Sequence, residues 1–399
     1  MKKILLVNDH LYFGGGGDAV FNFEHNLLLK HGYEVYTFSF NTENPKNKSV
    51  NYSYQESSSR NKRKLQKFLG DKSIDKAFIN ALNNIKPDLI HIHLISKYPL
   101  AVYKNIHGYK VIQTLHGPNL FCASSWGGLK DGSPCELGIG IKCFTRGCVS
   151  LATSLLYQQL QSRYWVDMQE SVDLFHCPSR QLYGHIKRLG LVNSNYIPLG
   201  IDICFEAPVI KQNNPRSTLL FAGALAEQKG IKVLIESMKQ LVVRIPNVLL
   251  KIAGRGELTD WIKARISEYG LNQNIELLGF IDHEKIRDLY IEADIFVMPS
   301  IWHEQFGLVG PEALACETPC VGSNVGGIPE WLHHNEWGIL VPPNQVEDLT
   351  EALVTLIQNP KLRKDMGKRG REFVLREYGA KKYESNILNM VESVIKTSE

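Results

Sequence analysis

Short apolar runs alternate with longer stretches of helical spacing from one end of the chain to the other. Such alternation is typical of α/β folds built on parallel sheets. In the first half, five apolar runs predict strands at residues 3–8, 34–40, 89–94, 110–116 and 174–179. In the second half, six runs predict strands at 218–225, 248–254, 275–280, 295–300, 319–323 and 338–343. The pattern therefore predicts an α/β protein with two doubly wound, Rossmann-like parallel sheets.

A turn-rich segment, residues 196–217, divides the two halves, because its prolines and asparagines interrupt the periodicity. We therefore expect an N-terminal domain at residues 1–197 and a C-terminal domain at residues 198–378. Residues 379–399 are expected to form a helix that packs back toward the N-terminal domain. Ligands of doubly wound sheets bind beyond the carboxyl ends of the strands, so a cleft between the two domains is the expected site.

The composition is that of an ordinary globular protein, with 399 residues, 44% of them hydrophobic and 22% charged. A net charge of +4 is too small to indicate nucleic-acid binding, although it suits an anionic small ligand or a membrane surface. The apolar run near the N-terminus, residues 4–7, is too short for a signal peptide, so we expect a cytoplasmic protein. The basic stretch at residues 56–76 could contact the inner face of a membrane, but such runs more often mark solvated segments.

Two motifs follow predicted strands of the first half. In "FGGGGDAVFNF", Gly15 and Gly16 belong to a glycine-rich turn between a strand and a helix, which lets backbone N–H groups approach an anionic ligand. By itself this turn is equally well explained as structural. In "TLHGP", His116 ends a strand, where α/β active sites place polar groups. A histidine that simply hydrogen-bonds to the backbone is the alternative.

Two motifs of the second half indicate a phosphate ligand. In "GALAEQKGIKV", Lys229 precedes a predicted helix, where the helix dipole disfavours a cation unless an anion is bound. In "WHEQFGLVGPEALAC", a helix is predicted from about residue 308 to 316, and its free N–H groups suit a phosphate. Glu312 would reach the same ligand from this helix. Glu304 precedes the helix, so the two carboxylates are expected to reach different parts of one ligand rather than to form an acid/base pair.

Taken together, the motifs resemble the retaining GT-B glycosyltransferases of family GT4. "EQFGLVGPE" matches the E-x7-E signature of that family, and six further motifs follow in the family's order and spacing: "GGGGDAV", "TLHGP", "GALAEQKG", "IAGRGEL", "YIEADIFVMPS" and "VGGIPEWL". The resemblance covers essentially the whole chain. A segment bearing cysteines after "TLHGP" is further similar to a bacterial subgroup of the polysaccharide type.

The resemblance implies an enzyme of polysaccharide biosynthesis that moves a sugar from a nucleotide-sugar donor, a UDP- or GDP-sugar, to a glycan or lipid-linked acceptor with retention of configuration. It implies no metal and no cofactor for catalysis. Glu304 would bind hydroxyls of the transferred sugar, Lys229 would offset the leaving diphosphate, and His116 would lie beside the reacting sugar; these three are the expected catalytic residues. The expected donor-binding residues are Gly15, Gly16, Arg255, Phe306, Gly307, Leu308, Val309 and Glu312, the last of which would hydrogen-bond the ribose.

One departure from the family pattern affects the donor site. Ala224 stands where the family commonly has an arginine that joins the lysine on the diphosphate. Arg255 is the expected replacement. The departure keeps a second hypothesis open, a catalytically degenerate partner subunit. A nucleotide-sugar 2-epimerase of the same architecture is a third hypothesis, although such enzymes lack the spacing from Glu304 to Glu312.

The eight cysteines fall into two groups. Four of them lie within 27 residues, with the spacing C-x12-C-x7-C-x4-C, at Cys122, Cys135, Cys143 and Cys148. No CxxC pair occurs, so the pattern leaves three interpretations open: reduced structural thiols, a metal site, or disulfide and redox chemistry. The other four are expected to be small core residues: Cys177, Cys204, Cys316 and Cys320.

Overall fold

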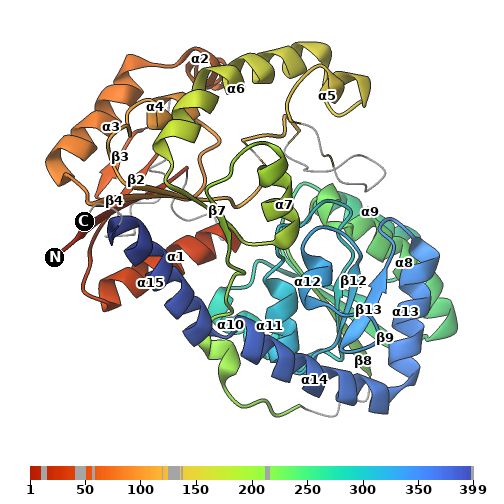
Figure 1. The fold of residues 1–399 in the computed structure, drawn as a ribbon. Helices are drawn as coiled ribbons and strands as arrows, with labels where there is room; N and C mark the ends of the chain where they lie inside the picture. Colours follow the sequence, from red (N-terminus) through yellow and green to blue (C-terminus); the bar gives the residue numbers. More distant parts are fainter. Residues whose placement is uncertain are drawn as a thin grey trace. The chain divides into compact units, whose positions relative to one another are not determined.

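The computed structural model describes residues 1–9, 16–40, 51–55, 59–118, 120–124, 135, 138–211 and 216–396 (Figure 1). The chain forms two compact units. The N-terminal unit contains Met1–Pro198 together with Glu384–Glu399, and the C-terminal unit contains Leu199–Tyr383. Both are α/β, as the alternating pattern predicts.

The N-terminal unit is built on a seven-stranded parallel sheet with the order β3-β2-β1-β4-β5-β6-β7. Its strands are β1 (Lys3–Asn8), β2 (Glu34–Ser39), β3 (Tyr52–Ser53), β4 (Leu89–Ile92), β5 (Val111–Thr114), β6 (Leu174–Cys177) and β7 (Ser194–Tyr196). The five predicted strands are confirmed. The two edge strands, β3 and β7, are two and three residues long, which is too short for a recognisable hydrophobic pattern.

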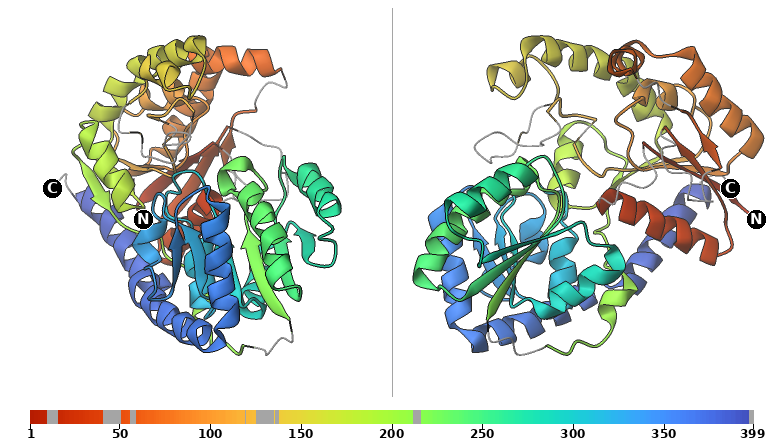
Figure 2. Two further views of the ribbon diagram at one scale, coloured as in Figure 1. Left: turned by 90° about the vertical axis from the view of Figure 1, so that its right-hand side faces the viewer. Right: turned by 180° about the vertical axis from the view of Figure 1, so that it is seen from behind.

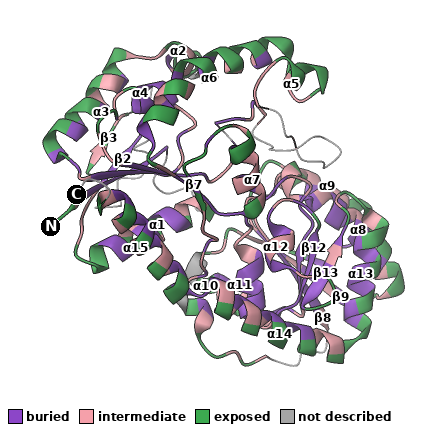
Figure 3. Cartoon of the chain, viewed as in Figure 1, coloured by how far each residue is buried: buried purple, intermediate pink, exposed green. Residues whose placement is uncertain are grey.

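Helices surround this sheet because its central strands are buried on both faces, as is usual for parallel sheets (Figure 3). They are α1 (Gly16–Lys30), α2 (Arg60–Leu69), α3 (Lys72–Ile85), α4 (Pro99–Tyr103), α5 (Lys142–Thr145), α6 (Leu151–Ser171), α7 (Arg180–Arg188) and most of α15 (Ala380–Lys396). Side-chain caps mark several helix starts. Ser150, for example, accepts a hydrogen bond from the Thr153 N–H group at 3.2 Å at the start of α6.

The C-terminal unit is built on a six-stranded parallel sheet with the order β10-β9-β8-β11-β12-β13. Its strands are β8 (Ser217–Ala222), β9 (Val248–Ala253), β10 (Ile275–Gly279), β11 (Ile295–Met298), β12 (Cys320–Ser323) and β13 (Gly338–Val341), so all six predicted strands are confirmed. Its helices are η1 (Ile203–Glu206), η2 (Glu227–Lys229), α8 (Ile231–Arg244), α9 (Thr259–Glu268), α10 (His283–Glu292), α11 (Val309–Ala315), α12 (Ile328–Trp331), α13 (Val346–Gln358) and α14 (Pro360–Tyr378).

In each unit the sheet lies between layers of helices (Figure 2). In the C-terminal unit, α8 packs against α13 on one side and α11 packs against α14 on the other. No helix in the described ranges combines the length and the apolar character needed to cross a membrane.

Of the four cysteines expected in the core, Cys204 is exposed in η1, so the prediction is wrong for this residue. Its short helix instead buries the next residue, Phe205, against Tyr290, which leaves Cys204 at the surface.

Candidate functional site

Lys229 and Glu304 form an ion pair in the C-terminal unit. Lys229 ends η2, after β8, and its ammonium lies 2.6 Å from Oε1 of Glu304. Only 5% of the Glu304 side chain is exposed, against 27% of that of Lys229. Ser300 also donates to Oε1 at 2.7 Å. The Glu304 carboxylate is therefore held in place by a cation and a hydroxyl. The cation, Lys229, lies 75 positions away from Glu304 in the sequence.

Backbone packing fixes the position of this pair. Gly230 follows Lys229 with a left-handed φ of 68°, and a Cβ at this position would lie 1.8 Å from the carbonyl oxygen of Pro299. Only glycine fits there, which brings the start of α8 against the end of β11. On the other side, Gly327 donates its N–H to the carbonyl of Glu304 at 2.7 Å. The "VGGIPEWL" motif thus supports the loop that carries Glu304.

Trp302 adds a side chain that the sequence did not single out. Its ring lies under the Lys229 ammonium, 5.1 Å from the ring centroid, which is a cation–π distance. Its indole N–H is buried and has no hydrogen-bond acceptor within the described part of the chain. An unpaired buried donor is costly in a folded protein, so this N–H group is available to a ligand oxygen.

Glu312 lies in the first turn of α11, where a helix was predicted from about residue 308. The residue is buried, with 7% of its surface exposed, and the hydroxyl of Tyr290, from α10, donates to Oε2 at 3.1 Å. Burial, followed by the charge of Glu312, raises the pKa of Tyr290 well above its usual range. Tyr290 therefore remains a neutral donor that orients the carboxylate.

The residues that lead into α11 present backbone N–H groups. Gly307 has a left-handed φ of 80°, and a Cβ there would lie 2.4 Å from Cε of Met298. The Phe306 carbonyl accepts from Nε1 of Trp331 at 2.6 Å, which anchors this turn in the core. Among the described residues, no acceptor is found for the N–H groups of Gly307, Leu308 and Val309. Free N–H groups of this kind suit an anion.

Ala224 and Arg255 lie in two loops in direct contact. Ala224 is exposed after β8, and the N–H of the next residue, Leu225, donates to the carbonyl of Arg255 at 3.0 Å. The Arg255 side chain lies over Gly279, at the end of β10, where a Cβ would be 3.8 Å from Nε. The backbone of Arg255 is thus beside the position of the missing family arginine. The guanidinium of Arg255 itself lies at the end of β10, beside Gly279.

His116 follows β5 in the N-terminal unit and is half-buried. Nε2 lies 3.0 Å from Nδ1 of His93, and the two rings stack at 5.2 Å. A Cβ on Gly17, in the first turn of α1, would lie 3.5 Å from the His116 ring. The start of α1 is therefore close to this histidine. Gly16 is the first residue of α1, whereas Gly15 lies outside the described residues.

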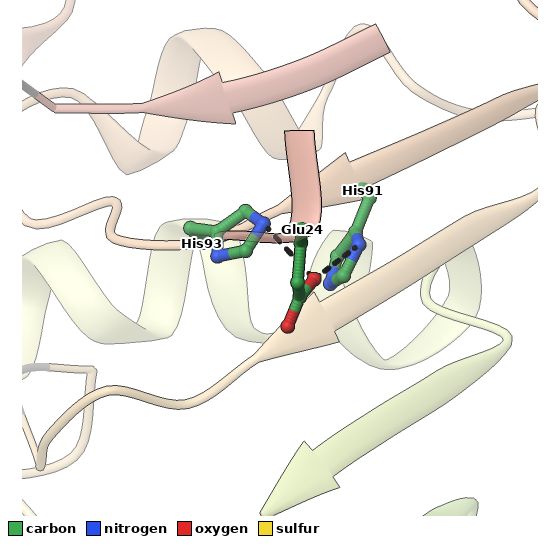
Figure 4. A group of neighbouring side chains, drawn as sticks. All are labelled: Glu24, His91 and His93. Atoms are coloured by element: carbon green, nitrogen blue, oxygen red, sulfur yellow. Dashed lines mark ion pairs between the residues drawn. The ribbon is translucent and has the colours of Figure 1, made fainter. Parts of the chain in front are cut away.

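A buried group behind His116 was not predicted. Glu24 of α1 lies 3.3 Å from Nδ1 of His91 and 3.5 Å from Nε2 of His93, and all three side chains are fully buried (Figure 4). The rings of His91 and His93 stack at 4.4 Å, so both present a nitrogen to the same carboxylate. A buried carboxylate is costly unless it is paired, and the two imidazole nitrogens are the groups that lie beside it here. The charge pattern of α1 alone gave no sign of this group.

Burial lowers the pKa values of the histidines around this group. The pKa of His116 falls to about 3, and a nearby charge on His176 would lower it further. Burial also lowers the pKa of His176, on β6, to about 4. The pKa values of His91 and His93 lie well below their usual range for the same reason. At neutral pH, His116 is therefore an uncharged imidazole able to accept or donate one proton.

The basic stretch at residues 56–76 includes α2. Lys62, Arg63 and Lys64 are exposed on this helix, together with Leu65 and Leu69, which are 60% and 63% exposed. Two interpretations of α2 stay open, a solvated surface helix and a contact with lipid, because exposed basic and apolar side chains lie on the same short helix.

The structure thus groups the predicted residues by unit. The C-terminal unit brings Lys229 and Glu304 into contact and places Phe306 to Glu312 along one continuous turn and helix. His116 and Gly16 belong to the N-terminal unit. Ser300, Trp302 and Tyr290 were missed because serine, tryptophan and tyrosine at these positions resemble ordinary core residues in sequence.

Comparisons with known proteins cover nearly the whole chain. The family model "Glycosyltransferase Family 4" matches residues 14–204, and the model "Glycosyl transferases group 1" matches residues 205–373. An uncharacterized glycosyltransferase of Methanocaldococcus jannaschii is 38% identical over 131 residues, which are 33% of this chain and 33% of that protein. The chain therefore matches about a third of the length of that relative.

Solved structures that share the fold include two of known identity. Sucrose-phosphate synthase from Thermosynechococcus elongatus superposes with a TM-score of 0.78 at 20% identity, with 100% of both chains covered. Anabaena HepE in complex with UDP-glucose superposes with a TM-score of 0.73 at 17% identity, covering 98% of this chain and 100% of HepE. At these identities the likeness establishes the architecture of two Rossmann-like domains.

Proposed function

Because the chain belongs to glycosyltransferase family 4 and has the GT-B fold, we propose that it transfers a sugar from a UDP-sugar to a glycan or lipid-linked glycan acceptor, with retention of the anomeric configuration. The observation that carries this proposal is the Lys229–Glu304 pair beside the free N–H groups that lead into α11. A cation and several amide donors suit a diphosphate, while a carboxylate suits sugar hydroxyls.

Each part of the donor has a proposed partner. Glu312, oriented by Tyr290, accepts hydrogen bonds from the ribose hydroxyls. The N–H groups near Phe306, Gly307, Leu308 and Val309 hold the diphosphate, with Arg255 as a further cation. Glu304 accepts from hydroxyls of the transferred sugar. Support for a uridine donor comes from HepE, which was solved with UDP-glucose.

The chemistry follows from charge development. Departure of the nucleoside diphosphate leaves positive character at the anomeric carbon and increases negative charge on the diphosphate. Fixed donors aimed at that developing charge lower the barrier, which is the role of Lys229 and the amide groups. His116, uncharged at neutral pH, is proposed to hydrogen-bond the reacting sugar, and Gly16 and Gly17 allow the start of α1 to approach. We propose that the transfer requires no metal and no cofactor.

Nucleotide selectivity is the first test of this proposal. We expect isothermal titration calorimetry of the purified protein to detect UDP binding and much weaker binding of GDP, ADP and dTDP. Radiolabelled UDP-sugars and an acceptor extract would then give a labelled glycan. If no nucleotide bound, the degenerate-partner hypothesis would replace the proposal. Conversion of the donor to an epimer without acceptor would identify an epimerase instead.

A second test addresses Glu312. We expect Glu312→Ala to weaken UDP binding about tenfold, since the loss of a hydrogen bond from a buried carboxylate to a ribose hydroxyl is worth roughly 1.5 kcal/mol. Glu347→Ala is the matched control, because Glu347 is also in the first turn of a helix of the same unit but is exposed. Equal calorimetric affinities of the two variants for UDP would contradict the assignment of Glu312.

A further inference from the structure

Four cysteines of the N-terminal unit line one small cavity. Its volume is about 20 Å³, and none of the four thiols is in a disulfide. A space of this size holds a single water-sized particle or ion. The lining residues are Phe121, Cys122, Ser124, Cys135, Gly138, Lys142, Cys143, Arg146 and Cys148. The cavity is thus formed mainly by sulfur donors and two cations.

Contacts with α6 fix the segment of the chain that carries these cysteines. Before Cys122, the Leu120 carbonyl accepts hydrogen bonds from Nε2 of Gln161 at 3.0 Å and from the Tyr164 hydroxyl at 2.7 Å. Both donors belong to α6. The chain is therefore fixed two residues before the first cysteine and six residues after the end of β5.

The same helix holds the other end of the segment. Ser154, in the first turn of α6, donates its hydroxyl to the Gly140 carbonyl at 2.5 Å. After α5, the N–H of Cys148 donates to the carbonyl of Cys143 at 2.9 Å, and Gly147 between them has a left-handed φ of 68°. This turn reverses the chain between the last two cysteines, and both of them line the cavity together with Cys122.

The charges at the cavity suit a metal bound by thiolates. A divalent cation is bound by deprotonated thiols, and four cysteines that line one small cavity can supply them. Four thiolates and one Zn²⁺ carry a net charge of −2, which Lys142 and Arg146 at the cavity can balance.

We propose that Cys122, Cys135, Cys143 and Cys148 bind one Zn²⁺ as a closed, structural tetrathiolate site that fixes the end of β5 to the start of α6. Four sulfur ligands in a tetrahedral arrangement are typical of structural zinc sites, which leave no position open for substrate. A cavity that accommodates one ion is too small for an iron–sulfur cluster. The site is separate from the proposed donor site and does not depend on the proposed activity.

Elemental analysis of the full-length protein tests this site. We expect about one zinc ion per chain after expression with added Zn²⁺ and purification without chelators. Cys143→Ser and Cys148→Ser should each lose most of the metal, whereas Cys204→Ser, which alters an exposed cysteine outside the cavity, should retain it. Iron in place of zinc, or zinc retained by both cavity variants, would overturn the proposal.

A second measurement is independent of the variants. We expect exchange of Zn²⁺ for Co²⁺ in the wild-type protein to produce the absorption bands of a tetrahedral cobalt–thiolate centre. We also expect the four cavity thiols to react with a thiol reagent only after a chelator removes the metal, whereas exposed Cys204 reacts before. Metal-free protein in which all four thiols react at once, or in which mass spectrometry finds disulfides between them, would rule the zinc site out.

Discussion

Replacement of Lys229 by alanine is expected to lower kcat about 100- to 1,000-fold, with a smaller effect on UDP affinity. The variant lacks one fixed donor to the negative charge that develops on the diphosphate. The stabilisation of the transition state by such a donor is worth roughly 3–4 kcal/mol. In the structure this ammonium lies 2.6 Å from Glu304 and over the ring of Trp302, so its position is already fixed before donor binds. Initial-rate kinetics with a UDP-sugar donor and a glycan acceptor would measure the change.

A neighbouring lysine provides the matched control. Lys232 also lies at the start of α8, but it pairs at 3.2 Å with Glu227 at the surface, where 39% and 54% of the two side chains are exposed. Surface pairs of this kind contribute little to stability. We therefore expect Lys232→Ala to retain the wild-type kcat. A similar fall in kcat for both variants would point to general electrostatics instead of a specific role for Lys229.

A double variant separates catalysis from folding. Lys229→Ala leaves the buried Glu304 carboxylate without its cation, which is expected to destabilise the C-terminal unit by about 1–3 kcal/mol. Adding Glu304→Gln removes that buried charge, so urea unfolding should return toward the wild-type midpoint while kcat stays low. Recovery of both stability and kcat in the double variant would mean that Lys229 acts only on the fold.

Mild acid is expected to destabilise the N-terminal unit strongly. Four histidines there have lowered pKa values in the folded state: His91, His93, His116 and His176. Each binds a proton when the chain unfolds below pH about 6.5, so the unfolded state takes up more protons and stability falls as the pH falls. At pH 5 this amounts to about 2 kcal/mol for each histidine whose folded pKa lies well below 5.

The window of this effect follows from the folded pKa values. The contribution of the neutral histidines to stability is fully present above pH about 6.5. It is lost as the pH falls toward their pKa values in the folded state, about 4 for His176 and about 3 for His116. Hydrogen exchange of peptides from β4 to β6, followed through urea series at pH 7.5 and pH 5, would measure the free energy of unfolding of this unit. His31→Gln, which changes an exposed histidine, should leave the difference unchanged. Equal stability at both pH values would contradict the neutral state of these histidines in the folded protein.

The strand pattern by itself determined most of the fold. Every run predicted as a strand is one, because parallel strands buried on both faces are continuous apolar segments that stand out in sequence. The short edge strands β3 and β7 were missed, since two or three residues carry no pattern. The E-x7-E spacing and the glycines around it also identified α11, because a helix start and left-handed turns depend on local residue types.

Contacts between distant segments could not be predicted in the same way. The pairing of Lys229 with Glu304, the donation from Tyr290 to Glu312 and the position of Glu24 beside two histidines each join residues from different elements. Nothing in the local sequence specifies which side chains meet across a sheet or between helices. The same reason explains the cysteines. Their spacing left three interpretations open, and only the tertiary structure brought all four to one cavity, where four sulfur donors suit a metal ion.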